Sequence, residues 1–547
     1  MPKITINDTE IEVAQGSTIM QAAVQLGIEV PYYCWHPGLS IAGNCRMCLV
    51  DVEGAPKPMI ACYTQVSDGM KINTQSEKAK QARQGTLEFL LANHPLDCPV
   101  CDQAGECELQ NYYMEHGQYD SRFDEQKIKK KKAISVGDKV MLDSERCVLC
   151  SRCVRFCDEI TGTGELGIVN RGNREEIAVF PGKEINNKYS GNVVDICPVG
   201  ALTDKDFRFK CRVWYLKSQD SVCPGCSNGC NIRIDGNLSR PQHGGEDRVM
   251  RLKPRENLEV NDYWMCDEGR YNYKFIDHNR ILNPSKGSQD AKEGIDYEEA
   301  IKALSEQIKA AVLEQRHGRV GVLASTQLTN EDLFAIKQLF KKSLGMDTVE
   351  HRFTYPKGDS DDFLIKADKS PNTLGAQTLE VIASGTYASG EAVIEKAEHG
   401  EFDLLISFGV DIASLIGDAR IQALVDKITL VYVGPNHNKT SEHAQLSISS
   451  TVYAEKEGTF TNFAGRVQRI WAALPPVGMA RPEWQIICDL SFALGFPLSY
   501  EDSEAIFTEI TKEVSAFSEM TYQKLGKQGM LLNNFSKKKE VVEKISK

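Results

Sequence analysis

Residues Cys147 to Cys157 read CVLCSRCVRFC, a run in which cysteines recur as Cys-x2-Cys-x2-Cys-x3-Cys. This is the spacing at which a short loop and helix supply thiolates to a 4Fe-4S centre, although Asp158 stands where proline is usual. The run therefore predicts an iron–sulfur domain. The remaining cysteines decide how many centres the chain holds.

Downstream of this run comes a second signal, Cys197-Pro198. In two-cluster ferredoxins the fourth cysteine of each run ligates the cluster of the other run. Cys197 should then complete the centre begun by Cys147, Cys150 and Cys153. Counting back from Cys197 by the same spacing gives positions without a thiol, namely Asn187, Ser190 and Val193. We therefore expect one 4Fe-4S centre here, with Cys157 as the stranded ligand of a lost second cluster.

An earlier group follows the pattern Cys-x10-Cys-x2-Cys-x13-Cys, which resembles the plant-type 2Fe-2S pattern with a longer first gap. Before it, Lys3–Ile6 and Glu10–Val13 alternate around an Asn-Asp turn and predict a β-hairpin. Ser17 is placed to cap a helix that Gly27 ends, and Leu49–Val52 reads as a strand. This part predicts a β-grasp ferredoxin fold. The group consists of Cys34, Cys45, Cys48 and Cys62.

Between these two groups lies the stretch ANHPLDCPVCDQAGECELQ, residues Ala92 to Gln110. A helix over about residues 76–93 delivers His94, and Cys98, Cys101 and Cys107 follow. Taken alone, one imidazole and three thiols suit either structural zinc or an iron–sulfur centre. The spacing alone does not distinguish a zinc site from an iron–sulfur centre.

A fourth group reads Cys-x2-Cys-x3-Cys with a distant fourth cysteine. Pro224, Gly225 and Gly229 give the tight backbone needed to wrap a cubane cluster, and a four-thiolate zinc site is the alternative. Cys211 and Cys488 belong to no group and are expected to be small core residues. The members of the fourth group are Cys223, Cys226, Cys230 and Cys266.

Composition narrows the function further. The 547 residues should form about three to five domains. A net charge of -12 argues against nucleic acid, and the basic run Lys127–Lys132 is expected to be a solvated connector or an acidic-partner patch. Neither a secretory signal nor a run of eighteen apolar residues is present in the sequence. In a reducing compartment, eighteen cysteines indicate metal ligands or buried thiols rather than disulfides.

The second half predicts an α/β domain. Val320–Ala324, Leu404–Phe408 and Thr429–Val433 read as buried parallel strands, and Glu331–Phe340 reads as a helix between them. One stretch in the first half, Gly162 to Gly167, matches the dinucleotide-binding motif G-x-G-x-x-G. That motif requires a preceding strand and a following helix, so we do not expect a nucleotide here.

The order of the four cysteine groups, with their flanking words, resembles the large iron–sulfur subunit (the G subunit) of bacterial NADH-quinone oxidoreductase, respiratory complex I. The words that carry the resemblance, in chain order, are PYYCWHPGLSIAGNCRMCLV, HPLDCPVCDQAGECELQ, CVLCSRCVRFC, GNVVDICPVGALTDKDFRF and CPGCSNGCNI. They lie within residues 1 to about 270. In the second half the best matching word is EKEGTFTNFAGRVQR, Glu455 to Arg469, which is similar to the family's molybdopterin-oxidoreductase-like domain.

The resemblance implies one 2Fe-2S centre on the first group and three 4Fe-4S centres, one of them ligated by His94, Cys98, Cys101 and Cys107. The centre on the Cys223 group is an extra one that only some bacterial members carry. The chain stops at Lys547 without room for the C-terminal cap that encloses molybdopterin, so no molybdenum, FMN or NAD is expected. Expected domains are 1–77 (2Fe-2S), 78–118 (His/Cys 4Fe-4S), 137–215 (ferredoxin-like 4Fe-4S), 216–272 (molybdopterin-oxidoreductase-type 4Fe-4S) and 273–547 (cofactor-free α/β scaffold).

The implied function is one-electron transfer from a flavin on a partner subunit toward quinone, coupled to proton translocation by the whole complex. The chain would be a peripheral subunit on the cytoplasmic side of the plasma membrane, without a complete active site of its own. The alternative is an electron-transfer subunit of a NAD-linked hydrogenase or formate dehydrogenase. A zinc scaffold protein would require all four groups to be misread.

Overall fold

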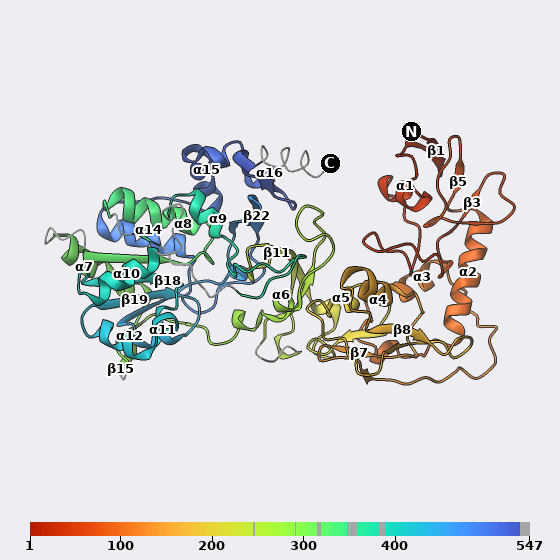
Figure 1. Ribbon diagram of the computed structural model, residues 1–547, viewed down its shortest axis with the longest axis horizontal. Helices are drawn as coiled ribbons and strands as arrows, with labels where there is room; N and C mark the ends of the chain where they lie inside the picture. The colour runs from red at the N-terminus through yellow and green to blue at the C-terminus, as the bar shows by residue number, and fades with distance from the viewer. Residues whose placement is uncertain are drawn as a thin grey trace. The chain divides into compact units, whose positions relative to one another are not determined.

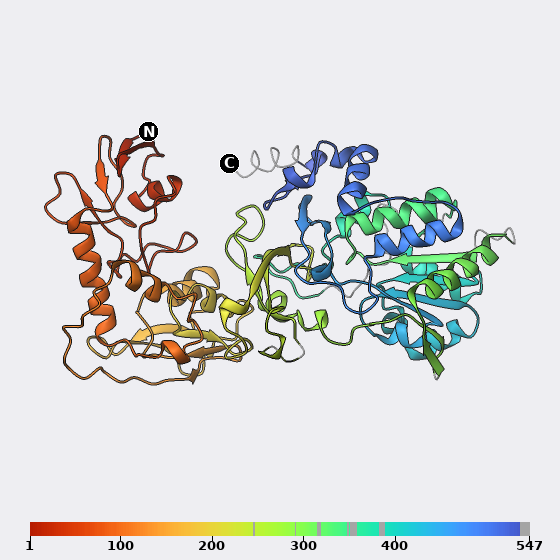
Figure 2. The same cartoon turned by 180° about the vertical axis from the view of Figure 1, so that it is seen from behind.

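The computed structural model describes residues 1–243, 245, 247–289, 291–313, 319–346, 349–350, 358–381 and 389–535. They form two compact units, Met1–Leu216 and Lys217–Lys547, and each is described by itself. Figures 1 and 2 draw the first unit in red to yellow and the second in green to blue.

The first unit begins with a five-stranded sheet of order β2-β1-β5-β3-β4, in which β1 and β5 are parallel. The predicted hairpin is confirmed, because Asn7 and Asp8 turn the chain with φ values of 46° and 68°. The apolar side of helix α1 covers the sheet. This is the predicted β-grasp arrangement. Its elements are β1 (Lys3–Ile6), β2 (Thr9–Glu12), α1 (Ile19–Gln25), β3 (Leu49–Val52), β4 (Met59–Ile60) and β5 (Lys71–Asn73).

The cap of α1 differs from the prediction. Thr18, not Ser17, is the N-cap, since its side chain accepts a hydrogen bond from the Gln21 amide and Gln21 reciprocates. The register is one residue later because only a side chain at position 18 meets a glutamine three residues on. Gly27, with φ of 67°, follows the helix end as predicted.

Helices α2 (Glu77–Ala92) and α3 (Glu108–His116) connect the first sheet to the next domain. The run Lys127–Lys132 forms a connector, as predicted, and Lys129, Lys131 and Lys132 are exposed, but Lys127 and Lys130 are half buried. Lys127 Nζ donates to the Leu91 and Ala92 carbonyls at 2.7 and 2.9 Å, where it satisfies the C-terminal end of α2. Lys132 lies 2.8 Å from a Glu145 carboxylate oxygen.

The rest of the first unit contains the small sheets β10-β7-β6 and β8-β9. Figure 1 shows the short helices α4 and α5 over strands β7 and β8. The elements are β6 (Ile134–Ser135), β7 (Val140–Leu142), α4 (Arg152–Arg155), the π-helix η2 (Phe156–Ile160), β8 (Leu166–Val169), β9 (Glu176–Val179), α5 (Asn192–Asp195) and β10 (Leu202–Asp204).

The second unit opens with the antiparallel sheet β11 (Lys217–Val222), β12 (Asn231–Gly236) and β13 (Val249–Pro254), followed by α6 (Asp267–Tyr271). A seven-stranded sheet of order β15-β14-β20-β19-β18-β16-β17 follows. Its parallel strands confirm the predicted α/β domain. They are β16 (Val320–Ala324), β17 (Val349–Glu350), β18 (Leu404–Phe408), β19 (Thr429–Gly434) and β20 (Leu446–Ser449), with β14 (Ser285–Ser288) and β15 (Ala291–Gly294) antiparallel at one edge.

Helices cover both faces of this sheet (Figure 1). One face carries α7 (Tyr297–Leu313), α8 (Asn330–Ile336), α14 (Glu483–Leu494) and α15 (Ser503–Glu513), and the other carries α10 (Ser389–Glu398), α11 (Ile412–Ile416) and α12 (Asp418–Val425). The helix predicted over 331–340 is α-helical only as far as Ile336. The chain continues as a π-helix from Lys337 to Ser343.

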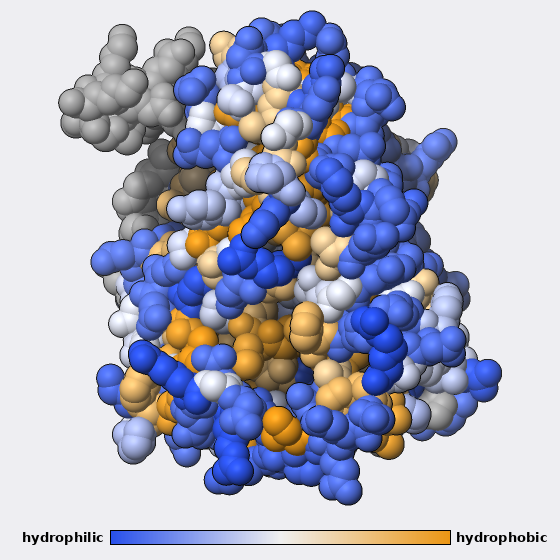
Figure 3. Space-filling view, turned by 90° about the vertical axis from the view of Figure 1, so that its right-hand side faces the viewer, coloured by the Kyte–Doolittle hydropathy of each residue, from blue (hydrophilic) through white to orange (hydrophobic). Residues whose placement is uncertain are grey.

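The surface of the first unit exposes several large apolar side chains. Phe89, Leu96 and Val100, around the second cysteine group, are 86%, 90% and 60% exposed. Figure 3 shows one face of the molecule on which apolar residues, in orange, gather in a hollow between polar ones. In the described parts of the chain, no helix is both long and apolar enough to cross a bilayer.

Candidate iron–sulfur centres

The first cysteine group lies on the loop between α1 and β3 and just beyond β4. Cys34, Cys48 and Cys62 are buried. Hydrogen bonding with the thiols of Cys45 and Cys62 lowers the pKa of Cys34, and the backbone N–H of Cys34 donates to Cys45 Sγ at 3.4 Å. The fold thus gathers the four predicted thiols at one place beside the sheet.

The second group lies between α2 and α3. Burial raises the pKa of Cys107 to about 11, and the neighbouring thiols of Cys101 and Cys98 add to this effect, so the three cysteines lie together. His94 follows the end of α2, and burial beside the cations Lys127 and Arg146 lowers its pKa to about 4. A neutral imidazole is the form that binds metal.

The third group lines a small cavity in the first unit. Four cysteines line it, three from one short run and one from far along the chain: Cys147, Cys150, Cys153 and Cys197. Apolar side chains complete the lining, including Leu142 and Ile177. Residues 142–202, which supply this lining, are all described, and Cys157 is not on the wall.

Cys157 is fully buried in the π-helix η2 and faces a different neighbour. Burial raises the pKa of its thiol, and so does the adjoining carboxylate of Glu165, to which the thiol is hydrogen-bonded. The same carboxylate accepts a 2.9 Å hydrogen bond from Asn187 Nδ2. Asn187 is the first of the positions where a second cluster would need a thiol. A polar network therefore stands where the count predicts a lost cluster.

The glycine-rich stretch that follows forms a turn between η2 and β8. The amides of Thr163 and Gly164 donate to the Cys157 carbonyl, and Gly162 has φ of 66°. A helix therefore precedes this stretch and a strand follows it, the reverse of the order that the dinucleotide motif requires.

The fourth group lies in the second unit, around β11, β12 and α6, and its four thiols are buried. Three of the sulfurs accept hydrogen bonds. Asn228 Nδ2 donates to Cys230 at 3.1 Å, the Gly269 amide to Cys266 at 3.3 Å, and the Gly225 amide to Cys223 at 3.5 Å. Hydrogen bonds to sulfur are one means by which proteins raise cluster potentials. A Cβ at Gly269 would lie 3.0 Å from Cys223 Sγ, so a larger residue here would require the thiol to shift by a few tenths of an ångström.

The first three groups pack around one apolar cluster in the first unit. This cluster is built from Tyr33, Cys34, Met47, Leu87, Leu109, Tyr112, Cys150, Val199 and Ala201, with Cys45, Cys107, Cys147 and Cys197 at its edge. Arg155 joins two ligand loops directly, since one guanidinium nitrogen donates to the carbonyls of Cys34 and, at 3.3 Å, Cys150. Arg152 lines the third-group cavity and donates to the carbonyls of Trp35 and Ile196.

Among the described residues, no three His, Cys, Asp or Glu side chains converge closely enough to hold one metal ion. An iron–sulfur cluster makes a different demand, because its own irons and sulfides separate the ligands. It needs a space walled by thiols, and the third-group cavity is such a space. The residues present therefore fit a multinuclear iron–sulfur centre.

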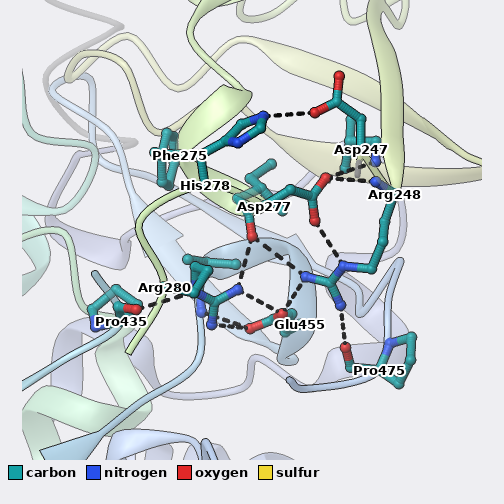
Figure 4. Close-up of polar contacts among 12 residues, drawn as sticks. Asp247, Arg248, Phe275, Asp277, His278, Arg280, Pro435, Glu455 and Pro475 are labelled. Atoms are coloured by element: carbon teal, nitrogen blue, oxygen red, sulfur yellow. Dashed lines mark hydrogen bonds and ion pairs between the residues drawn. The ribbon is translucent and has the colours of Figure 1, made fainter. Parts of the chain in front are cut away.

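In the second unit, the word Glu455 to Arg469 is engaged in internal contacts. Figure 4 shows Glu455 between the guanidinium groups of Arg248 and Arg280, with ion-pair distances of 2.6 and 2.7 Å. The next residue, Lys456, is buried 2.7 Å from an Asp332 carboxylate oxygen. Such buried ion pairs fix one arrangement of the chain because breaking either partner leaves an uncompensated charge.

Arg152, Arg155 and Glu165 were not singled out from the sequence. Both arginines lie inside the word CVLCSRCVRFC, so their proximity to a cluster was readable, but the loops that they join were not. Cys211 and Cys488 are buried, as expected of core cysteines.

Four family profiles match the chain. They are described as a 2Fe-2S iron-sulfur cluster binding domain (residues 2–77), an NADH-ubiquinone oxidoreductase-G iron-sulfur binding region (83–122), a ferredoxin-like domain of NADH-quinone oxidoreductase subunit 3 (137–203) and molybdopterin oxidoreductase (384–493). Together with the fold and the thiol groups, they define an iron–sulfur electron-transfer protein with a molybdopterin-oxidoreductase-like second half.

Relatives that align over most of their length indicate the family more specifically. Iron-sulfur protein 1 of the mitochondrial NADH dehydrogenase [ubiquinone] of Solanum tuberosum is 30% identical over 623 residues, which cover 93% of this chain and 82% of that protein. The NADH-quinone oxidoreductase G subunit of Rickettsia bellii is 29% identical and aligns over 100% of this chain and 93% of its own. The chain belongs to the family of NADH-quinone oxidoreductase G subunits.

Other alignments are shorter. With the corresponding G subunit of Rickettsia felis the identity is 39% over 357 residues, 65% of this chain, and the chain spans about half of that relative, 51%. Among solved structures, an NAD+-reducing [NiFe]-hydrogenase in the H2-reduced state matches 39% of this chain and 91% of its own at 29% identity and a TM-score of 0.36.

Proposed function

We propose that this chain carries electrons one at a time through a series of iron–sulfur centres within an NADH-quinone oxidoreductase. The electrons would come from a flavin on a partner subunit and pass toward quinone, and the whole complex would couple this flow to proton translocation. The observation that carries the proposal is the packing of three thiol groups around one apolar cluster, which keeps candidate centres close together and dry.

The proposed ligand sets are those predicted from the sequence. One 2Fe-2S centre and three 4Fe-4S centres would supply the redox chemistry, while the chain supplies thiolates, hydrogen bonds to sulfur and a water-excluding wall. The proposed domains remain 1–77, 78–118, 137–215, 216–272 and 273–547. The sets are Cys34, Cys45, Cys48, Cys62 for 2Fe-2S, and His94, Cys98, Cys101, Cys107, then Cys147, Cys150, Cys153, Cys197, then Cys223, Cys226, Cys230, Cys266 for 4Fe-4S.

Partners and location follow from the same proposal. The exposed apolar side chains around Cys98 suit contact with neighbouring subunits of the peripheral arm, including the one that binds flavin and NADH. The complex would lie on the cytoplasmic side of the plasma membrane, with this chain reaching the membrane only through partners. The α/β half would act as a scaffold without molybdenum, consistent with the internal ion pairs of Glu455 and Lys456.

Reduction of the purified chain tests this proposal. Under anaerobic conditions dithionite should bleach the visible iron–sulfur absorbance, whereas NADH alone should leave it unchanged because the chain binds no flavin. Adding the flavin-bearing subunit of the same complex should let NADH bleach it. Bleaching by NADH without that subunit, or near-stoichiometric molybdenum or tungsten in metal analysis, would move the function to a dehydrogenase.

A further inference from the structure

Arg83 is a buried cation without a partner. It lies on α2, has 0% exposure, and is the largest fully buried side chain of the described residues. Among the described residues, none of the three guanidinium nitrogens of Arg83 (Nε, Nη1 and Nη2) has a hydrogen-bond partner. All residues of the first unit, 1–216, are described, so no side chain of that unit is left out as a partner for Arg83.

Such a group is costly unless something compensates it. A guanidinium carries five N–H donors and a permanent charge, and an unpaired buried ion costs several kcal/mol. Burial lowers the pKa of Arg83, and the one charge that opposes this effect is the thiolate of Cys48. His116, another titratable group close to Arg83, offers no negative charge, and its own pKa is lowered by burial and by Arg83.

The helix places Arg83 against the first cysteine group. Helix α2 packs on β3, which begins at the residue after Cys48. One turn further along α2, Thr86 Oγ1 lies 3.4 Å from the carbonyl oxygen of Arg46, inside the Cys45–Cys48 loop. Arg83 and Leu87 are both buried on this face of α2, so the cation lies beneath the loop that supplies two thiols.

We propose that Arg83 is the buried counter-charge of the 2Fe-2S centre and that its charge raises the reduction potential of that centre. This inference rests on the proposed ligand set of the first group. Four thiolates and two sulfides leave an oxidised 2Fe-2S centre with a net negative charge, and reduction adds one more. A fixed cation in a dry site stabilises the more negative state more strongly.

The test is a redox titration of the 2Fe-2S EPR signal in the full cluster-loaded chain. Arg83→Met and Arg83→Gln remove the charge, Arg83→Lys keeps it, and Lys80→Met removes an exposed charge from the same helix as a matched control. We expect the reduced-to-oxidised ratio at fixed potential to fall by about tenfold in the first two variants, or about 59 mV for one electron. Arg83→Lys and Lys80→Met should stay within about threefold of wild type.

The remaining outcomes of this titration also support or contradict the role proposed for Arg83. Loss of the centre in the Met and Gln variants with retention in Arg83→Lys would equally support a required charge. An intact signal with an unchanged midpoint in Arg83→Met and Arg83→Gln would overturn the inference, and so would loss of the centre in all three variants. If the wild-type chain showed no 2Fe-2S signal, that result would instead contradict the proposed ligand set of the first group.

Discussion

Cys197→Ala should remove one 4Fe-4S centre, whereas Cys157→Ala should leave every centre in place. A search for the ferredoxin string alone would give the opposite result, because Cys147, Cys150, Cys153 and Cys157 fit that string. The cavity of the third group is walled by Cys197 and not by Cys157. Loss of Cys197 leaves a cluster iron with a missing thiolate, and a centre with three ligands is readily lost or reduced in nuclearity.

The Cys157 thiol has a packing role instead. It is hydrogen-bonded to Glu165 in a site where no cluster is expected, so its truncation should cost at most about 1–3 kcal/mol of stability. Iron content and low-temperature EPR of the two variants, measured beside wild type, check the prediction. Loss of a cubane signal in Cys157→Ala with retention in Cys197→Ala would reverse the assignment.

Changing His94 should shift the potential of the second centre or abolish it. His94→Cys should retain the centre and lower its midpoint, since a fourth thiolate places an additional negative charge beside the iron. His94→Ala should weaken or lose the centre because no side chain replaces the ligand. His116→Ala is the control: His116 is a partly buried histidine at the end of α3 and is not a proposed ligand, so its loss should leave the midpoint nearly unchanged.

Redox titration followed by EPR provides the measurement. An unchanged or raised midpoint in His94→Cys would contradict ligation by His94. An effect of His116→Ala as large as that of His94→Ala would show that the change in midpoint is not specific to the proposed ligand.

Local patterns made much of the fold predictable. Cysteine spacing and the alternation around Asn7-Asp8 indicated the ferredoxin-like domains, and the apolar runs at Val320–Ala324 and Leu404–Phe408 indicated the parallel sheet. Each of these signals depends on neighbours a few residues apart. Pairing Cys197 with Cys147 across about fifty residues was possible only because ferredoxins cross their fourth ligands.

The features that could not be predicted from the sequence depend on tertiary contacts. Arginine is rarely fully buried, so Arg83 would ordinarily be placed on the exposed face of α2, although Ala79, Arg83 and Leu87 recur at helical spacing. The contacts of Lys127 in the basic run before Ala133 were not predictable, because its partners, the Leu91 and Ala92 carbonyls, lie far away in the chain. The π-helical end of α8 has no local signature that competes with an ordinary helix pattern.

Counting metal in the anaerobically purified chain tests the proposed cluster content most directly. We expect about fourteen irons per chain, with matching acid-labile sulfide, from one 2Fe-2S and three 4Fe-4S centres. Low-temperature EPR should resolve signals of both cluster types. About ten irons with one stoichiometric zinc would contradict this cluster content by removing one cubane, at the His94 group or the Cys223 group.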